Sequence, residues 1–339
     1  MADLVLLTGI SGFLGGHVAL DLLEAGYHVR GSVRDLRKAD KVRQTLARHG
    51  ADVTRLEFVA LDLLSDSGWA EAMAGVRYLQ HTASPFVTTM PRDRMELIRP
   101  AVEGTERALE AALAANVERV VLTSSMAAIA YGHPTSQRDF TARDWTELGG
   151  RDITAYTESK TRAERRAWEI VDAAGRHDLL VTVNPSAILG PLLDDDPGTS
   201  AALVGRLLNG SVPAAPRIAF GVVDVRDVAA LHVAAMTDPD AAGHRLPISV
   251  DTLTLMEMSR TLAKAIPERR GKLPRFEMPD WMVRLYAIFD GDVRSNLNEL
   301  GVYKRLDATE ARTVLGRPLL SADDAVIASA RSLLAENLV

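Results

Sequence analysis

A glycine-rich turn near the start of the chain constrains the fold more than any other feature. It follows a short apolar run, residues 4–8, and it precedes a segment in which apolar residues recur at helical spacing as far as Gly26. A continuous apolar run of this length indicates a strand that is buried on both faces. The order of strand, glycine turn and helix is typical of a unit that binds the pyrophosphate of a dinucleotide. The turn residues that we expect to contact a dinucleotide are Gly9, Ser11, Gly12, Phe13, Leu14 and Gly15.

Strand-like and helix-like segments alternate from this turn to about residue 185, and the pattern then becomes irregular. The alternation predicts an α/β fold with a doubly wound (Rossmann) parallel sheet. We expect a dinucleotide-binding domain of residues 1–185, to which residues 219–240 return. Residues 186–218 and 241–339 then form a smaller, discontinuous substrate-binding lobe, and a cleft between lobes is the usual place for a substrate.

Composition narrows the class of function. The chain has 339 residues, no cysteine, a net charge of −6 and a pI near 5.8. Disulfides, thiolate metal sites and cysteine nucleophiles are excluded, and a dominant basic surface for nucleic acid is disfavoured. No apolar run approaches the ~20 residues of a membrane span, and no basic stretch with a cleavage site opens the chain. We expect a cytoplasmic monomer or homodimer that binds a small molecule, without a metal, a nucleic acid or a membrane.

The end of the predicted second strand, residues 27–33, bears on the choice of cofactor. Sites that select NAD usually place an acidic residue there, on the ribose 2′-hydroxyl. Val33 occupies that position here, Arg34 follows it, and three further basic residues come within the next seven positions. A guanidinium fits a 2′-phosphate, so we expect NADP(H). The alternative is a basic surface loop without a ligand. Asp35, an acidic residue close to the strand end, would instead favour NAD.

Three later strands end in residues that suit a cofactor or a substrate. Open α/β sheets bind ligands beyond the carboxyl ends of their strands. A carboxylate after the third strand can accept the adenine amino group while a leucine packs on the ring. Small residues after the next strand let the chain pass beside ribose and phosphates, and a hydroxyl after the fifth can bind the substrate oxygen. These residues are Asp62, Leu63, Thr82, Ala83, Ser84, Thr123, Ser124 and Ser125.

A tyrosine and a lysine four positions apart stand at the start of a helix-like segment. Tyr156 and Lys160 share one helix face, because a helix turns once in about 3.6 residues. A fixed ammonium favours the phenolate form of a nearby phenol. The pair therefore predicts the proton donor and acceptor that carbonyl reduction requires. The alternative, a surface tyrosine and lysine with this spacing by chance, is disfavoured by the glycine turn upstream.

These motifs occur in an order that resembles the extended short-chain dehydrogenase/reductases. The likeness rests on the glycine turn, the segment 123–125, Tyr156 with Lys160, and the pair Asn184-Pro185. It extends over most of the chain and is strongest up to about residue 235. The segments Val33–Asp35, Leu122–Ser125, Asn184–Ser186 and Asp224–Ala229 look like the dihydroflavonol reductase group. That group includes plant cinnamoyl-CoA reductases and yeast aldehyde and ketone reductases of the methylglyoxal reductase type.

The resemblance implies an NADPH-dependent carbonyl reductase and a role for each matching residue. Ser125 matches the serine that polarises the carbonyl, Tyr156 the proton donor, and Lys160 the lysine that binds the nicotinamide ribose and favours the phenolate. The loop 185–188 matches the wall against the nicotinamide. The further residues that the resemblance assigns to the cofactor are Arg34, Lys41, Thr123, Pro185 and Ile188.

Departures from the wider superfamily narrow the substrate. Nucleotide-sugar dehydratases carry Thr-Asp-Glu shortly after the serines, whereas this chain has 126–128 as Met-Ala-Ala, which disfavours dehydration. The candidate substrate wall is mostly apolar and favours an aryl or alkyl ketone, a keto ester or an aldehyde over a polyhydroxylated flavonoid. A flavanonol-like substrate stays open. The expected wall comprises Phe86, Val87, Met126, Ala127, Tyr131, Leu192 and Leu193, beside Ile188.

Three other functions remain open at this point. A sugar epimerase would use the same tyrosine and lysine with tightly bound NAD. A 3β-hydroxysteroid dehydrogenase would be a closer relative of the reductases than an epimerase is. A sensor that binds NADPH without turnover would belong to a different, non-enzymatic class. The sequence leaves the physiological substrate, the stereochemistry, the direction in the cell and the oligomeric state undetermined.

Overall fold

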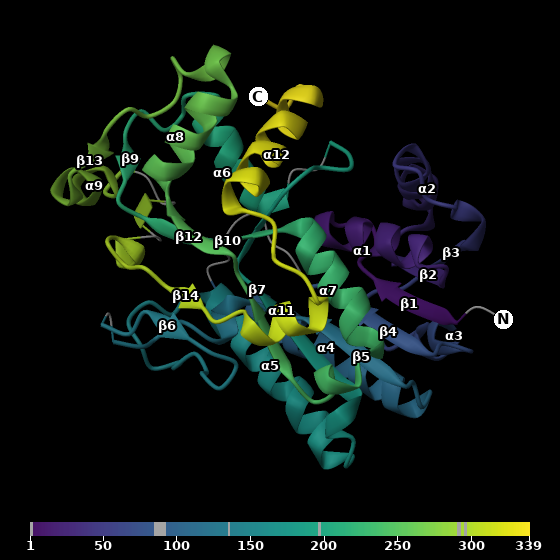
Figure 1. Ribbon diagram of the computed structural model, residues 1–339. Helices are drawn as coiled ribbons and strands as arrows, with labels where there is room; N and C mark the ends of the chain where they lie inside the picture. The colour runs from purple at the N-terminus through teal and green to yellow at the C-terminus, as the bar shows by residue number, and fades with distance from the viewer. Residues whose placement is uncertain (1–2, 85–92, 135, 196–197, 290–292, 295–296) are drawn as a thin grey trace.

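The computed structural model describes residues 3–84, 93–134, 136–195, 198–289, 293–294 and 297–339. Its centre is a seven-stranded sheet in which every neighbouring pair of strands is parallel (Figure 1). This confirms the α/β fold with a doubly wound sheet. In spatial order the strands are β11 (Arg245–Ile248), β7 (Leu180–Pro185), β5 (Arg119–Thr123), β4 (Tyr78–His81), β1 (Leu4–Thr8), β2 (His28–Val33) and β3 (Leu56–Ala60).

Helices cover both faces of this sheet (Figure 1). Strand β1 shows how the sequence builds both layers, because Val5 and Leu7 lie in one apolar core and Leu6 lies in the other. Successive side chains of a strand point to opposite faces, so a doubly covered strand reads as a continuous apolar run. One face carries α1 (Phe13–Glu24), α2 (Ala39–Arg48), α7 (Val225–Thr237) and α11 (Thr309–Leu315). The other face carries α3 (Trp69–Met73), α4 (Met95–Ala114) and α5 (Ala155–Ala173).

The strand order reverses at β1 and β4, which are neighbours in the sheet. From β1 the chain proceeds to β2 and β3 on one side, and the later strands lie on the other. In open α/β sheets this switch point is where ligands bind, beyond the carboxyl ends of the strands. Here the glycine turn after β1 lies against the residues after β4, since a Cβ atom on Gly9 would be 2.9 Å from the Cα of Ala83.

A smaller lobe lies above the large sheet in the view of Figure 1. Its three-stranded sheet has β8 (Ala187–Leu189) parallel to β10 (Ala219–Asp224), and β10 antiparallel to β12 (Asp251–Thr254). An apolar core joins this sheet to α6 (Gly198–Leu208), α8 (Leu255–Ala265) and α12 (Ala322–Ala335). The remaining short elements are β6 (Asp139–Phe140) paired with β14 (Arg305–Leu306), β9 (Ala215–Pro216) paired with β13 (Glu277–Met278), and α9 (Asp280–Tyr286).

Two strands lie in a different sheet from the one expected. Strand β11, which the sequence assigned to the smaller lobe of residues 241–339, is the edge strand of the large sheet. Strand β10, expected to return to the large sheet with residues 219–240, lies in the three-stranded sheet, whereas α7 of that segment packs on the large one. The expected boundaries are therefore wrong for these two strands. A short apolar run predicts a buried strand, but it does not indicate which other strand it pairs with.

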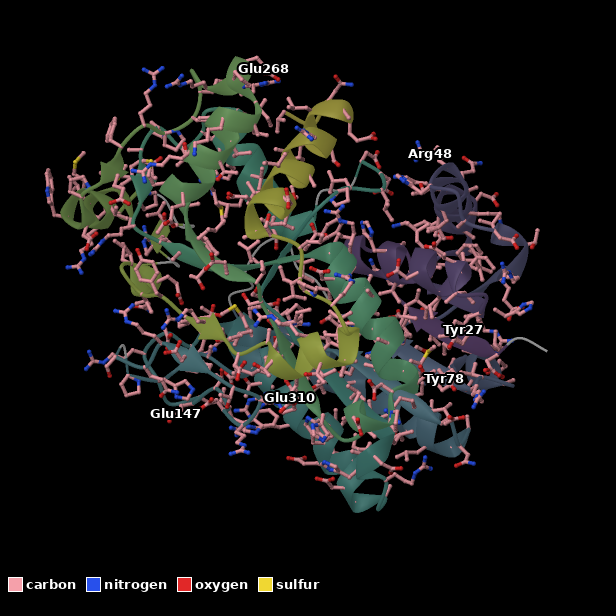
Figure 2. All side chains as sticks on the ribbon, in the orientation of Figure 1. Tyr27, Arg48, Tyr78, Glu147, Glu268 and Glu310 are labelled. Carbon is pink, nitrogen blue, oxygen red and sulfur yellow. The ribbon has the colours of Figure 1, made fainter. Side chains whose placement is uncertain are left out.

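The amino-terminal ends of the strands form the edge opposite the glycine turn. There Tyr27 and Tyr78 pack edge to face, with ring centroids 6.3 Å apart (Figure 2). No helix within the described ranges is long and apolar enough to cross a membrane.

Candidate active site

The glycine turn joins β1 to α1 in a tight loop. Gly9 adopts a φ of +76°, which favours glycine, and its carbonyl accepts a 2.9 Å hydrogen bond from the N–H of Gly12. A Cβ atom on Gly15 would lie 2.1 Å from the Gly9 carbonyl oxygen, so helix and turn pack this closely only with glycine there. Helix α1 begins at Phe13 with no side-chain cap from Gly12. Its first N–H groups are therefore available as donors to an anionic group.

The other turn residues have varied surroundings. Ser11 is exposed, Phe13 packs edge-on against His17 with ring centroids 5.6 Å apart, and Leu14 packs against the apolar core under α1. Their contacts with a dinucleotide remain predictions.

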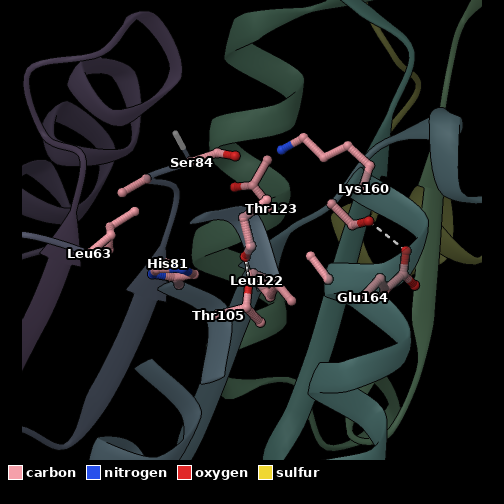
Figure 3. Close-up of a pocket in the computed structure, with 12 residues that line it drawn as sticks. Leu63, His81, Ser84, Thr105, Leu122, Thr123, Lys160 and Glu164 are labelled. Carbon is pink, nitrogen blue, oxygen red and sulfur yellow. Dashed lines mark hydrogen bonds between the residues drawn. The ribbon is translucent and has the colours of Figure 1, made fainter. Parts of the chain in front are cut away.

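A small pocket of about 20 Å³ lies between the carboxyl ends of β4 and β5 and the helix α5 (Figure 3). Lys160 extends from α5 toward Thr123 and Ser84 across this pocket (Figure 3). The structure thus brings together five residues that the sequence assigned to the cofactor. They are Leu63, Ala83, Ser84, Thr123 and Lys160.

A buried histidine lies behind Thr123. Nδ1 of His232, on α7, is 2.8 Å from Oε1 of Gln80, and Nε2 is 2.9 Å from Oγ1 of Thr123. The Gln80 amide nitrogen donates to the His232 carbonyl, which fixes the amide oxygen as the acceptor. We therefore assign the ring proton to Nδ1, and the Thr123 hydroxyl donates to Nε2. Burial lowers the pKa of His232 to about 3, so the ring is neutral and the Thr123 oxygen can accept from a donor in the pocket.

The two serines after β5 make different contacts. The Ser124 hydroxyl donates to the buried carboxylate of Glu164 at 2.5 Å. The Ser125 oxygen accepts a 3.1 Å bond from the N–H of Ala127 at the start of a short 3-10 turn. The proton of Ser124 is thus committed within the protein, whereas the bond to Ser125 uses only its oxygen. The O–H of Ser125 is not used in that bond, and its predicted role toward a substrate stays a prediction.

Tyr156 and Lys160 lie on the first turns of α5. Thr154 fixes the start of this helix by accepting a 3.1 Å bond from the N–H of Thr157. The Lys160 Nζ is 6.0 Å from the centroid of the Tyr156 ring, and Tyr156 is 39% exposed. Lys160 lines the same pocket as His81 at the end of β4, and burial, with the charge of Lys160, lowers the pKa of His81 to about 4. The ammonium thus lines the pocket and lies near the partly exposed Tyr156 ring. That the two act in one site stays a prediction.

A second tyrosine lies near Tyr156. Burial, with smaller contributions from the neighbouring Glu299, Tyr156 and Asp152 side chains, raises the pKa of Tyr131 above its usual range. Lys304 Nζ is 4.0 Å from the centroid of the Tyr131 ring and pairs with Glu299 at 2.8 Å and Asp152 at 3.2 Å. Tyr131 is thus a neutral phenol held beside the predicted proton donor.

The rest of the predicted substrate wall is divided among several places. Met126 packs with Tyr131 against a small core, and Ala127 is buried beside them. Leu192 belongs to the core of the smaller lobe. A Cβ atom on Gly16 in α1 would lie 2.9 Å from Cδ1 of Leu193, which places the Leu193 side chain beside the first turn of that helix. Phe86 and Val87 lie outside the described residues, and all these wall assignments stay predictions.

The remaining predicted cofactor residues lie in or just after strands. Pro185 ends β7, and Ile188 in β8 packs against the core under α1. Oδ1 of Asp62 accepts from the N–H of Leu64 at 3.0 Å and the residue is exposed after β3. The Thr82 hydroxyl donates to the Thr8 carbonyl at 2.7 Å, which ties the ends of β4 and β1 together.

The basic residues after β2 differ in whether the fold already gives them an acidic partner. Arg34 directly follows the strand, is exposed, and has no hydrogen bond or ion pair within the described ranges. Arg37 donates to the Asp35 carboxylate at 2.8 Å. Lys41 Nζ lies 2.5 Å from Oδ1 of Asp195, so the acidic loop already pairs with the lysine that the resemblance assigned to a phosphate. Within the described ranges, Arg34 is thus a cation beside the strand end that the fold leaves open to an anion.

Glu164 is a site residue that the sequence reasoning missed. Its side chain is fully buried and accepts hydrogen bonds from Ser124, Thr182, Asn184 and Arg245. The available signal was its place four positions after the lysine of the predicted pair, on the same helix face, together with polar residues inside a strand that must be buried.

Comparison with known proteins identifies the family of the chain. The NAD dependent epimerase/dehydratase family matches residues 5–250. The chain is 35% identical over 285 residues to cinnamoyl-CoA reductase CAD2 of Medicago truncatula, which covers 83% of this chain and 84% of that one. It is 34% identical over 244 residues to tetraketide alpha-pyrone reductase 2 of Arabidopsis thaliana, which covers 70% and 75%.

Solved structures agree as well. Gre2 of Candida albicans in complex with NADPH superposes on 98% of this chain and 99% of its own, with a TM-score of 0.79 and 26% identity. These matches confirm the resemblance to the extended short-chain dehydrogenase/reductases and to the reductases among them. The chain belongs to the NAD dependent epimerase/dehydratase family.

Proposed function

We propose that the protein is an NADPH-dependent reductase that converts an aldehyde or ketone to an alcohol, with Tyr156 as the proton donor. The observation that carries the proposal is the position of Lys160, which extends toward the strand-end residues Thr123 and Ser84 (Figure 3) and whose Nζ is 6.0 Å from the centroid of the Tyr156 ring. The relatives named above are reductases, and the Candida albicans neighbour was solved with NADPH.

The residues present fit a dinucleotide. Gly15 leaves no room for a Cβ against the turn, and the uncapped start of α1 presents N–H donors where a pyrophosphate would lie. Leu63 and Ser84 line the pocket, where they would lie beside the adenine and the ribose, and Arg34 would hold a 2′-phosphate. Lys160 would donate to the hydroxyls of the nicotinamide ribose.

The chemistry follows from the hydroxyls and the ammonium. NADPH, when bound, supplies the hydride that reduces the carbonyl carbon. Ser125 donates a hydrogen bond to the carbonyl oxygen and stabilises the charge that develops there. Tyr156 gives its phenolic proton to the same oxygen, and Lys160 stabilises the phenolate that is left. The neutral phenol of Tyr131 forms a less polar flank, which suits an aryl or alkyl carbonyl compound.

A panel of aldehydes, ketones and keto esters, followed by NADPH absorbance and chiral analysis of the alcohols, tests this function. We expect consumption of NADPH with a subset of apolar carbonyl compounds and one dominant product enantiomer. Tightly bound NAD without consumption of added NADPH would instead indicate a sugar epimerase. Preferred oxidation of hydroxysteroids would indicate a hydroxysteroid dehydrogenase.

Cofactor choice gives a separate prediction. Arg34→Ala is expected to raise the KM for NADPH about 10- to 100-fold, because a hydrogen bond to a charged group contributes about 1.5–3 kcal/mol. The KM for NADH should change little, since that cofactor has no 2′-phosphate. Arg37→Ala is the matched control, because the Arg37 guanidinium is bound to Asp35. Steady-state kinetics with both cofactors would refute the role of Arg34 if the two KM values rose equally.

A further inference from the structure

The buried carboxylate of Glu164 joins α5 to three strands of the large sheet. Ser124 and Asn184 donate to its Oε2 at 2.5 and 2.7 Å, from the ends of β5 and β7. Arg245 of β11 and Thr182 of β7 donate to its Oε1 at 2.6 and 3.1 Å. A fully buried carboxylate is tolerated only when it is paired and hydrogen-bonded in this way. The carboxylate is therefore a fixed point between the helix and the sheet.

The partners of Glu164 adjoin the proposed catalytic groups. Ser124 directly precedes Ser125, and Asn184 directly precedes Pro185 of the predicted nicotinamide wall. The Asn184 amide nitrogen also lies 3.4 Å from the Ser125 carbonyl oxygen. Figure 3 shows Glu164 directly below Lys160 on the same helix, and the Ser124 hydroxyl donates to this Glu164 carboxylate. The Glu164 carboxylate thus links α5, which carries the predicted proton donor, to the end of β5, which precedes Ser125.

The positive partner of this carboxylate is held rigidly. The Arg245 guanidinium lies 3.7 Å from the centroid of the Trp145 ring. Its Nη1 donates to the carbonyls of Ala142 and Asp144 at 2.7 and 2.6 Å. The guanidinium therefore has little freedom to follow a displaced carboxylate, and the position of Glu164 is set from the far side of the site.

We propose that Glu164 is a positioning residue, which sets the place of Ser125 relative to Tyr156 and Lys160 through its bond to Ser124. This inference rests on the carbonyl reduction proposed above. Proton transfer and oxyanion stabilisation need donors held to within about 0.5 Å of the productive geometry. A displacement of about 1 Å at such a site can cost about 100-fold in rate. Release of the bond to Ser124 therefore slows the chemical step more than it weakens the binding of NADPH.

The experiment compares Glu164→Gln with Ser124→Ala. In the first variant the amide turns an N–H₂ group toward other donors, and we expect kcat to fall at least about tenfold. Buried Arg245 also loses its counter-charge there, so a lower thermal unfolding midpoint is expected. Ser124→Ala removes one hydroxyl and no charge, and it keeps the test usable if the first variant folds poorly. Its kcat is also expected to fall about tenfold, while the KM for NADPH changes less than about threefold.

Ser259→Ala is the matched control. Ser259 is also a buried serine, and its hydroxyl donates a single 2.7 Å bond to the Pro274 carbonyl in the smaller lobe. This variant should keep the wild-type kcat. For each variant, kcat, KM, the isotope effect with deuterated NADPH, the NADPH dissociation constant by fluorescence and the unfolding midpoint are measured. A positioning defect raises the isotope effect, because hydride transfer becomes more rate-limiting.

The result expected is a fall in kcat for both site variants, and a Glu164→Gln/Ser124→Ala double variant no slower than Glu164→Gln alone, because both act through one bond. Wild-type kcat in Ser124→Ala, additive losses in the double variant, or an equal loss in Ser259→Ala would each overturn the proposal. Tyr156→Phe is assayed in parallel. Retained activity there would refute the proposed mechanism itself, whatever the Glu164 variants show.

Discussion

Tyr156→Phe is expected to lower kcat by about 100- to 10,000-fold, the contribution of a positioned general acid. The phenylalanine ring keeps the shape of the side chain at the start of α5 and lacks only the hydroxyl group, whose proton the carbonyl oxygen must receive. Because Lys160 and the glycine turn are untouched, the NADPH dissociation constant should stay within about threefold of the wild-type value. Steady-state kinetics with a fluorescence titration of NADPH provide both numbers.

Tyr27→Phe is the matched control for this variant. Tyr27 lies at the amino-terminal edge of the large sheet, where its ring packs on Tyr78 (Figure 2). Loss of this phenolic hydroxyl should leave kcat unchanged, because the residue lies at the opposite end of the strands from the site. A Tyr156→Phe enzyme with wild-type turnover would show that the proton comes from another group.

Gly15→Ala is expected to destabilise the fold and weaken the binding of NADPH at the same time. The new Cβ would lie 2.1 Å from the Gly9 carbonyl oxygen and 2.8 Å from its carbonyl carbon, both backbone atoms that cannot rotate away. Overpacking typically costs about 1–3 kcal/mol, and a clash with backbone falls at the upper end of that range. The expected result is a thermal unfolding midpoint several degrees lower and a large rise in the NADPH dissociation constant.

The neighbouring glycine offers the control. At Gly16 the closest atom to an added Cβ is the terminal Cδ1 of Leu193, at 2.9 Å, which a side-chain rotation can move. Alanine also favours the helix by about 1 kcal/mol over glycine, so Gly16→Ala should keep the wild-type midpoint within a few degrees. Equal behaviour of the two variants would contradict the role assigned to the close contact at Gly15.

The large sheet follows from the sequence because its signals are local. In the first strand, Val5 and Leu7 pack in one core and Leu6 packs in the other, which is why the strand is a continuous apolar run. This run and the glycine turn after it predict the first strand, turn and helix. Pairing of strands far apart in the chain carries no such signal. Strand β11 reaches β7 across about sixty residues, which explains why its sheet was assigned wrongly.

The candidate site shows the same division. The spacing of Tyr156 and Lys160 and the serines after β5 could be read directly, because helix periodicity and strand ends place them. Partnerships across the fold could not be read. Lys41 meets Asp195 only because the loop from the smaller lobe lies beside α2. The buried group of Glu164 and Arg245 likewise joins residues 81 positions apart.

The most direct test of the proposed reduction is the fate of a labelled hydrogen. The enzyme is incubated with a ketone that it turns over and with NADPH that carries deuterium at C4, and the alcohol is analysed by mass spectrometry and NMR. We expect one deuterium on the carbinol carbon, delivered to a single face of the carbonyl. An alcohol that forms without the label from either C4-deuterated epimer of NADPH would contradict hydride transfer from the cofactor and, with it, the function proposed for this chain.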